Sequence, residues 1–398
     1  MGHCRRPAGE HHPIRPCAMN AHHPADHPVL EVDLDAIALN WRAVERAYSG
    51  TRIGAVVKRN AYGLGIERIV PWLFQLGCAD FWVATLDEGV ALRALLGARR
   101  ARIFVLHGLG GVTPLTHAEH GLIPVLADLG ELALARRVAA VRAMPLAVAV
   151  HLDTGLTRLG LDAAQVSALC QDPTAFAGLD LQAWVTQLGR FQDPDAPECI
   201  EQRTRFFEWT AELPPAERSL STSSCVFADV RWHLDHARVG SALYGVETAP
   251  ANLQGFAPVA TLRAPVLRVA EVAAGAEVGY GGVYRLPVSA TLATLAIGYG
   301  HGRPIHLGDR GSVVLAGQTV PIVGGVSMGM ITADVSTLPP GSVQPGDFAE
   351  IYGPNQRIHE LASALGMAPS ALLVPTADRA RRTYRGSSVV ELRSVDAA

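Results

Sequence analysis

The chain contains the stretch Ile53-Gly54-Ala55-Val56-Val57-Lys58, which continues directly into Arg59-Asn60-Ala61-Tyr62-Gly63-Leu64-Gly65. Val56 and Val57 are β-branched and favour a buried strand, whereas the glycine-containing segment that follows cannot continue one. The pattern therefore places Lys58 at the C-terminal end of a strand, where α/β folds bind their ligands. A lysine among apolar neighbours is poorly solvated as a cation, so its pKa falls and its amine becomes nucleophilic. Lys58 is thus a candidate for Schiff-base formation, and the alternative is an ordinary surface lysine just past a strand.

The composition is that of a folded protein that binds small molecules. Of the 398 residues 49% are hydrophobic and 18% are charged, and the net charge of -3 gives no electrostatic footprint for nucleic acid. No apolar run reaches the roughly 20 residues that span a bilayer, so no membrane partner is expected. Six cysteines without a CxxC pair predict neither a disulfide framework nor a metal site, and reduced thiols favour a cytoplasmic location. They are Cys4, Cys17, Cys78, Cys170, Cys199 and Cys225.

The first 28 residues differ from the rest of the chain. They hold six of the fifteen histidines and five prolines, with almost no aliphatic run. Lacking an apolar core, the segment does not read as a secretory signal. We expect a disordered His/Pro-rich tail over residues 1–28, with Met1 or Met19 as the true start.

Residues 29–257 predict a barrel. A helix with Ile37, Trp41 and Val44 at helical spacing behind a capping Asp35 precedes the first strand. Strand-like apolar runs then alternate with helical stretches, and this spacing predicts βαβ units that close into a (β/α)8 TIM-type barrel. The expected strands cover residues 53–57, 80–85, 102–106, 122–126, 146–150, 180–185, 219–222 and 237–239.

Residues 258–398 predict a second, mainly β domain. Short apolar runs separated by Gly and Pro replace the helical pattern, and helices are expected only at 357–366 and 368–374. The expected strands cover residues 259–272, 291–297, 312–316, 319–323, 331–335 and 346–352.

Polar side chains follow the expected barrel strands and should meet at one face. Lys58 and Tyr62 follow the first strand, and the segments 153–158 and 186–187 follow the fifth and sixth. Ser223-Ser224 follows the seventh strand, and Arg238-Val239-Gly240-Ser241 closes the eighth. Loops after the last two strands commonly bind phosphate, here through the Ser224 hydroxyl and the amides of Gly240 and Ser241. A lysine and a phosphate site at one barrel mouth indicate pyridoxal 5'-phosphate, although Ser224 could also be a simple turn residue and Arg238 part of a structural ion pair.

With these residues in view, the chain resembles alanine racemase from about residue 29 to residue 386. Seven motifs occur in order, the first of which is highly specific. They are Ala55 to Gly65 as quoted above, Asp153-Thr154-Gly155-Leu156-Thr157-Arg158-Leu159-Gly160, Arg238-Val239-Gly240-Ser241-Ala242-Leu243-Tyr244-Gly245, Val278-Gly279-Tyr280-Gly281, Ile297-Gly298-Tyr299-Gly300, Pro321-Ile322-Val323-Gly324 and Ser327-Met328.

The resemblance implies a barrel followed by a β domain, in a head-to-tail homodimer whose subunits complete each other's sites. Lys58 would be the Schiff-base lysine and one catalytic base, and Tyr280 the base on the opposite face, supplied by the partner. Arg238 would face the pyridine nitrogen, where a permanent cation favours racemisation over transamination. The resemblance further assigns Arg158, Met328 and Tyr299 to the substrate, and Tyr62, Ser224, Gly240 and Ser241 to the phosphate.

Several positions depart from the family pattern, all of them around the expected site. His151 stands where a carbamylated lysine often orients the substrate arginine, and Gln187 replaces the histidine beside the catalytic tyrosine. Gly329 replaces an aspartate, Leu220 a histidine behind the pyridine arginine, and Ser370 a phosphate-binding tyrosine. These changes leave the lysine chemistry in place, and they fall in the substrate pocket and among the residues that support the site residues.

The leading hypothesis is a PLP-dependent racemase that interconverts L- and D-alanine and supplies D-alanine for peptidoglycan. The alternatives are a racemase of broader or different specificity, and a PLP-binding protein with little turnover. Retention of both Lys58 and Tyr280 favours an enzyme, because a carrier needs only the lysine.

Overall fold

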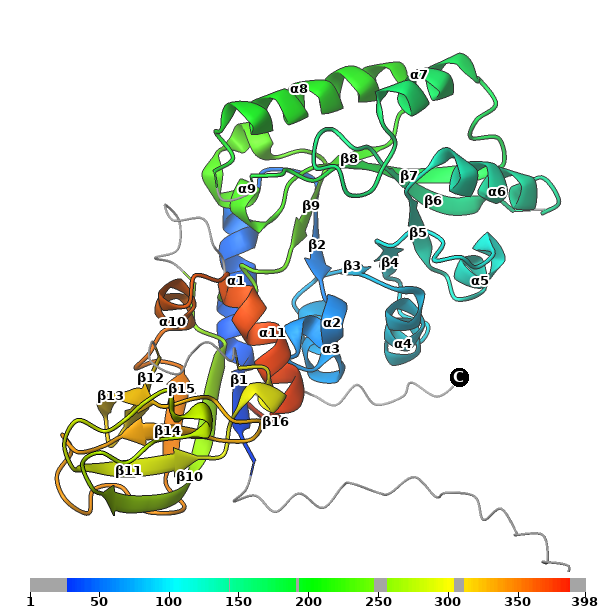
Figure 1. Cartoon of the computed structure of the whole chain (residues 1–398). Helices are drawn as coiled ribbons and strands as arrows, with labels where there is room; N and C mark the ends of the chain where they lie inside the picture. Colours follow the sequence, from blue (N-terminus) through cyan, green and yellow to red (C-terminus); the bar gives the residue numbers. More distant parts are fainter. Residues whose placement is uncertain (1–26, 143, 191–192, 247–255, 304–310, 387–398) are drawn as a thin grey trace, which may run out of the picture.

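The computed structural model describes residues 27–142, 144–190, 193–246, 256–303 and 311–386. Except for its last two residues, the expected N-terminal tail lies outside these ranges. The described chain forms two eight-stranded sheets, which lie toward opposite ends of helix α1 (Figure 1). One sheet is parallel throughout, and the other is mainly antiparallel.

The parallel sheet is the predicted barrel, with strand order β8-β7-β6-β5-β4-β3-β2-β9. It closes where Arg238 N donates to Ser221 O at 2.9 Å and where Thr222 bridges Arg238. The strands are β2 (Arg52–Val56), β3 (Asp80–Val83), β4 (Arg102–Val105), β5 (Ile123–Leu126), β6 (Leu146–His151), β7 (Leu179–Val185), β8 (Glu217–Ser219) and β9 (His236–Val239).

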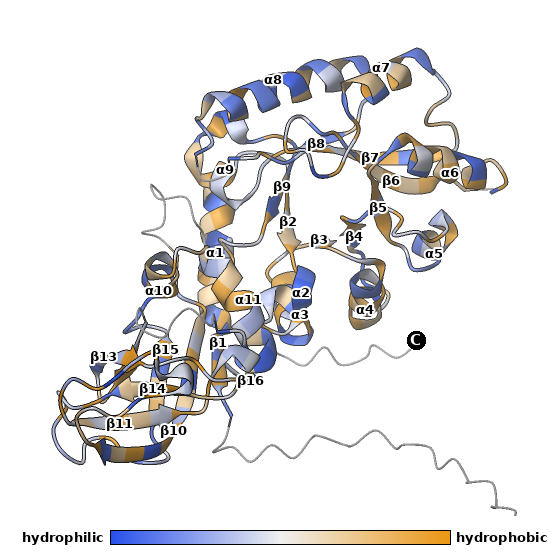
Figure 2. Cartoon of the chain, in the orientation of Figure 1, coloured by the Kyte–Doolittle hydropathy of each residue, from blue (hydrophilic) through white to orange (hydrophobic). Residues whose placement is uncertain are grey.

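Helices alternate with the barrel strands. Capping starts several of them: the Thr85 hydroxyl accepts from Glu88 N while the Glu88 carboxylate accepts from Thr85 N, a reciprocal pair that begins α4. Figure 2 shows α8 as largely hydrophilic, whereas the barrel strands β5 and β6 are hydrophobic, as buried parallel strands require. The helices are α1 (Leu34–Ala47), α2 (Lys58–Tyr62), α3 (Ile66–Gln75), α4 (Leu86–Leu96), α5 (Pro114–Glu119), α6 (Leu129–Ala139), α7 (Ala163–Gln171), α8 (Pro197–Glu212) and α9 (Ser223–Ala228).

The second sheet has the order β11-β14-β13-β12-β15-β10-β1-β16. Its predicted strands are present, together with the two predicted helices. The elements are β1 (Val29–Asp33), β10 (Ala260–Val272), β11 (Ala290–Leu295), β12 (Ser312–Leu315), β13 (Gln318–Val323), β14 (Ile331–Asp334), β15 (Phe348–Tyr352), α10 (Ile358–Ala364), α11 (Pro369–Arg379) and β16 (Arg381–Arg385), with 3-10 turns η3 (Tyr280–Gly282) and η4 (Tyr299–His301).

Strand β1 corrects the expected division of the chain, because it belongs to the second sheet and not to the barrel. It pairs antiparallel with β10 and parallel with β16, a strand that sequence analysis missed. Its alternating burial, with Leu30 and Val32 inside, suits a sheet with one covered face. The helix cap is likewise Asp33 and not Asp35, since the Asp33 carboxylate accepts from Ala36 N at 3.0 Å.

Two strand ends also differ from expectation. Strand β2 ends at Val56, and Lys58 begins α2, because the backbone of Val57 (φ -115°, ψ 17°) leaves the extended region. The expected strand 219–222 is instead β8 at Glu217–Ser219, and the chain reaches α9 by residue 223. The first correction places Lys58 at the start of a helical turn, and the second moves Ser221 and Thr222 from a strand into the connection between β8 and α9.

A cluster of charged side chains, here called the basal charge cluster, closes the other end of the barrel. Its members are the first residues of five strands: Arg52, Asp80, Arg102, Glu217 and His236. Arg102 donates two hydrogen bonds of 2.8 Å to Asp80 and bonds of 3.0 and 3.2 Å to Glu217. The fully buried His236 ring lies 3.5 and 3.4 Å from the same two carboxylates. Residues at this end of a barrel serve stability and not catalysis.

Candidate active site

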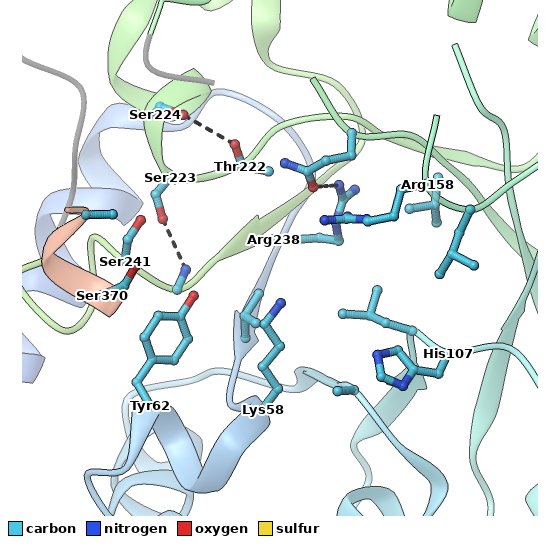
Figure 3. A pocket seen from close by; sticks show the side chains of 18 of the residues that line it. Lys58, Tyr62, His107, Arg158, Thr222, Ser223, Ser224, Arg238, Ser241 and Ser370 are labelled. Atoms are coloured by element: carbon cyan, nitrogen blue, oxygen red, sulfur yellow. Dashed lines mark hydrogen bonds between the residues drawn. The ribbon is translucent and has the colours of Figure 1, made fainter. Parts of the chain in front are cut away.

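A pocket of about 850 Å³ opens at the C-terminal ends of the barrel strands (Figure 3). Its size is typical of small-molecule sites. Among the described residues that line the pocket, the ionisable side chains include lysine, arginine and histidine, and none is a carboxylate. The structure brings together there most of the residues expected from sequence: Lys58, Tyr62, Arg158, Ser224, Arg238, Gly240 and Ser241, with His151, Gln187 and Ser370.

Lys58 enters the pocket from an unusual turn. Arg59, Asn60, Ala61 and Tyr62 all have positive φ between 52° and 59°, a left-handed conformation that is costly for residues with a side chain. Neighbours hold this turn, since Arg59 N donates to the Glu88 carboxylate at 2.8 Å and the Asn60 amide oxygen accepts from Ile66 N. Strain of this kind persists where surrounding contacts impose it, often at functional sites. Here it directs both Lys58 and Tyr62 into one cavity.

The surroundings of Lys58 favour its neutral amine. Burial lowers the pKa of Lys58, and the positive charges of Arg158 and Arg238 lower this pKa further. Desolvation and like charges act in the same direction because both disfavour the ammonium form. Both effects shift Lys58 toward the neutral, nucleophilic form of its amine.

Arg238 is held rigidly in the pocket wall. Its Nη1 donates to Ser219 O and Ser219 Oγ, both at 2.7 Å, and its Nη2 donates to Thr186 O at 2.6 Å and Gln187 Oε1 at 3.2 Å. The guanidinium also lies 5.5 Å from the ring centre of Trp82. Burial lowers the pKa of Arg238 to about 10, so the side chain stays charged at neutral pH.

The two expected departures around Arg238 leave it among uncharged groups. Gln187 contributes its amide oxygen to Arg238 where the family pattern has a histidine. Leu220 is fully buried in an apolar cluster with Leu188 and Trp232, and so offers no polar contact. The charge of Arg238 is therefore balanced by carbonyl and hydroxyl dipoles.

A group of hydroxyls and glycine backbone forms one end of the pocket. Tyr62, Ser223, Ser241 and Ser370 approach one another there in Figure 3. A Cβ built on Gly240 would lie 2.7 Å from Tyr62 Oη, so only glycine allows the phenol so close to this backbone. This group is called the hydroxyl cradle below.

Arg158 sits on the loop after β6, which Asp153 fastens. Asp153 Oδ1 accepts from the amides of Gly155, Leu156 and Thr157 at 3.0, 3.0 and 2.9 Å. Beside this loop, burial lowers the pKa of His151 to about 4, aided by the charges of Arg238 and Arg158. His151 is therefore neutral at neutral pH and supplies no anion to Arg158.

Three expected residues lie outside this pocket, on the second sheet's loops. Tyr280 is 80% exposed, Met328 65% and Tyr299 39%. Tyr299 and Met328 lie close together, because Tyr299 N donates to Ser327 O and Gly300 N to Met328 O. Within one chain these residues do not meet Lys58, and neither does Gly329, where a Cβ would find no atom within 4 Å.

Sequence analysis missed two polar pocket residues, His107 and Thr222. His107 directly follows the expected strand 102–106, so the rule that ligands bind at strand ends could have found it. Thr222 was hidden by the wrong strand 219–222. Ser223 lies in the pocket as expected, together with Ser224, but no sequence signal distinguishes the two hydroxyls.

Comparison of the sequence with known protein families gives a match for each of the two parts of the chain. Residues 32–248 match the description "Alanine racemase, N-terminal domain", and residues 259–384 match "Alanine racemase, C-terminal domain". The chain belongs to the alanine racemase family. The expected family and the barrel-plus-β fold are thereby confirmed.

Individual relatives give the same result over most of the chain. The chain is 38% identical to the alanine racemase of Acidiphilium cryptum and 36% to that of Rhodospirillum rubrum, covering 90% of this chain in each case and 99% and 96% of those proteins. It is also similar to the structures of alanine racemase from Bartonella henselae with covalently bound pyridoxal phosphate (TM-score 0.86) and of biosynthetic alanine racemase from Pseudomonas aeruginosa (TM-score 0.82). Each is 30% identical, covering 90% of this chain and 99% of that one.

In the described part of the chain, no helix is both long and apolar enough to cross a membrane. Among the same residues, no group of three or more His, Cys, Asp or Glu side chains could hold a metal ion.

Proposed function

We propose that the chain is a pyridoxal 5'-phosphate-dependent racemase that interconverts L-alanine and D-alanine. The observation that carries the proposal is the basic pocket that joins Lys58, whose pKa is lowered, to Arg238 and to the hydroxyl cradle. Family membership supports the reaction, since relatives of similar length are named alanine racemase.

The residues present fit the cofactor. A nucleophilic amine suits its aldehyde, a permanent cation suits its ring nitrogen, and hydroxyls with backbone amides suit its phosphate. Lys58, Arg238 and the group Tyr62, Ser224 and Ser241 would hold these three groups. Gly240, whose amide donates to Ser223 Oγ, would act on the phosphate end through that hydroxyl. When bound, the cofactor supplies a conjugated ring that accepts the electrons released at Cα.

Two bases on opposite faces of Cα explain inversion. Lys58 would remove or return the proton on one face, and Tyr280 would do so on the other. Arg158 would bind the substrate carboxylate, which fixes the direction of the Cα–H bond. Arg238, whose Nη atoms are fully engaged with protein oxygens, would keep its own protons and so leave the ring nitrogen unprotonated.

The shared site requires a second copy of the chain. Tyr280, Tyr299 and Met328 are exposed on loops of the second sheet, so they are available to a partner's pocket. We therefore assign the working form to a head-to-tail homodimer in which the partner supplies the second base and part of the substrate site. The cellular role assigned is cytoplasmic supply of D-alanine for peptidoglycan.

One experiment tests the activity and the lysine together. Purified protein with PLP is incubated with L-alanine in deuterium oxide, and loss of optical rotation and of the α-proton signal is followed. Both should occur, and borohydride reduction followed by peptide mapping should place the pyridoxyl group on Lys58. Lys58 is the single lysine of the chain, so a pyridoxyl group missing from its peptide contradicts the assignment. Rotation that persists with alanine but is lost with another amino acid also contradicts it.

A further inference from the structure

Ser223 makes an unusual set of hydrogen bonds in the hydroxyl cradle. Its Oγ accepts from Gly240 N at 3.1 Å, a bond drawn in Figure 3, and from Ala242 N at 3.2 Å. A serine hydroxyl has two acceptor lone pairs and one donor hydrogen. Both lone pairs of Ser223 Oγ are thus occupied by backbone amides of the strand-to-loop turn after β9.

The remaining function of this hydroxyl is to donate. Ser223 is only 4% exposed, and it lines the pocket. Among the residues that the structure describes, none accepts a hydrogen bond from Ser223 Oγ. A buried donor without an acceptor is costly, and two incoming amides polarise the O–H bond further. The neighbouring Ser224 differs, because its Oγ lies 3.4 Å from a hydroxyl of the protein, Thr222 Oγ1.

The acceptor must be a ligand of this end of the pocket. Tyr62, Gly240, Ser241 and Ser370 surround the same space, and the described pocket lining offers no competing carboxylate. Neutral hydroxyls within a basic pocket favour an anion with several acceptor oxygens.

We propose that Ser223 is a phosphate-binding residue, whose O–H donates to the phosphate of pyridoxal phosphate. The amides of Gly240 and Ala242 donate to Ser223 Oγ, and they thereby strengthen the hydrogen bond that this hydroxyl donates to the phosphate. The proposal rests on the proposed function, and it assigns phosphate binding to a cradle residue that sequence analysis had not separated from Ser224.

The test compares two cofactor forms on the apoprotein. Binding of PLP, and of pyridoxal without the phosphate, is titrated by absorbance for the parent and for Ser223→Ala. A hydrogen bond to a charged group predicts about 10- to 100-fold weaker PLP binding and unchanged pyridoxal binding. Ser221→Ala is the matched control, since Ser221 is a buried serine of the same segment that donates to Trp232 O and does not line the pocket. Its two affinities should equal those of the parent.

The outcomes separate the possible roles. If Ser223→Ala binds PLP as tightly as the parent, or loses PLP and pyridoxal equally because the Gly240 turn has moved, the proposal is wrong. Ser223→Cys, which keeps the side-chain size but donates weakly, covers a failure of Ser223→Ala to fold and should also lose PLP affinity selectively. If the parent itself binds no PLP, the proposed function fails instead.

Discussion

Arg238 shows how single residues set the chemistry of this pocket. Four oxygen acceptors hold its guanidinium, and it remains a cation despite full burial. It also lowers the pKa of Lys58 across the pocket. One side chain thus forms part of the pocket wall and also acts on Lys58.

We predict that Arg238→Glu slows racemisation at least about tenfold and raises transamination, measured as pyruvate formed from alanine. A carboxylic acid can protonate the ring nitrogen, which strengthens the electron sink and prolongs the carbanion. Arg238→Lys keeps a cation there and should form no additional pyruvate. Equal pyruvate from the parent and the glutamate variant would show that Arg238 does not face the ring.

At the scale of elements, loops and not strands position the side chains. The loop after β6 carries Arg158 and includes Thr157 at φ 58°, a conformation that few non-glycine residues adopt. Its shape depends on Asp153, whose single oxygen accepts three amides. The adjacent Thr154 Oγ1 lies 2.8 Å from Thr186 Oγ1, which ties this loop to the one after β7.

We predict that Asp153→Ala raises KM for alanine by about tenfold with a smaller effect on kcat, because Arg158 loses its fixed position while Lys58 is untouched. Asp153→Asn still offers one acceptor oxygen to the three backbone amides, so its KM should lie close to that of the parent. Steady-state kinetics of the two variants give the answer. A KM for Asp153→Ala equal to that of the parent would mean that Asp153 does not position Arg158.

At the scale of the whole molecule, the expected site residues divide between two surfaces. Lys58 lies in the barrel pocket, whereas Tyr280 is exposed on the second sheet. An assembly that joins them must bring the barrel of one copy to the β domain of another. In such a dimer each site takes one of its two catalytic bases from each chain.

We therefore predict that two inactive variants complement each other. Lys58→Ala and Tyr280→Phe should each abolish racemisation, yet their mixed dimer holds one intact site, made of Lys58 from one chain and Tyr280 from the other. Random pairing should restore about a quarter of the parental racemase activity after co-expression. A mixture as inactive as its components would refute the shared site.

The basal charge cluster predicts how stability depends on pH. Burial alone would raise the pKa of Glu217, but the His236 ring at 3.4 Å and the hydrogen bonds from Arg102 outweigh it and lower this pKa to about 2. Folding thus depresses the pKa of Glu217 below its unfolded value of about 4.3. Ionised Glu217 stabilises the fold above that value, and its contribution is lost as pH falls toward 2.

When the pH falls from about 5 to about 3, the free energy of unfolding should therefore fall further for the parent than for Glu217→Gln. The expected difference is about 1 kcal/mol, after allowance for the partial exposure of Glu217. Urea unfolding at each pH measures the difference. Glu45→Gln, in the exposed pair with Arg42, is the control and should follow the parent. Identical pH profiles for the parent and Glu217→Gln would show that the cluster does not stabilise the folded state.

The sequence alone was sufficient for the barrel, the second β domain and the grouping of Lys58 with Arg238 and Gly240. Buried parallel strands are continuous apolar runs, and the residues after them must share one face, so both features can be recognised locally. The motif around Lys58 also predicted the family, which the comparisons confirmed.

Only the tertiary structure decided which distant segments meet. Strand β1 joins β10 and β16, which are more than 200 residues away, and no local pattern specifies such a partner. Ser223 was distinguished from Ser224 by amides of Gly240 and Ala242, which reach it only when β9 closes the barrel. Backbone hydrogen bonds of this kind carry no residue-specific signal, because every residue except proline has the same amide.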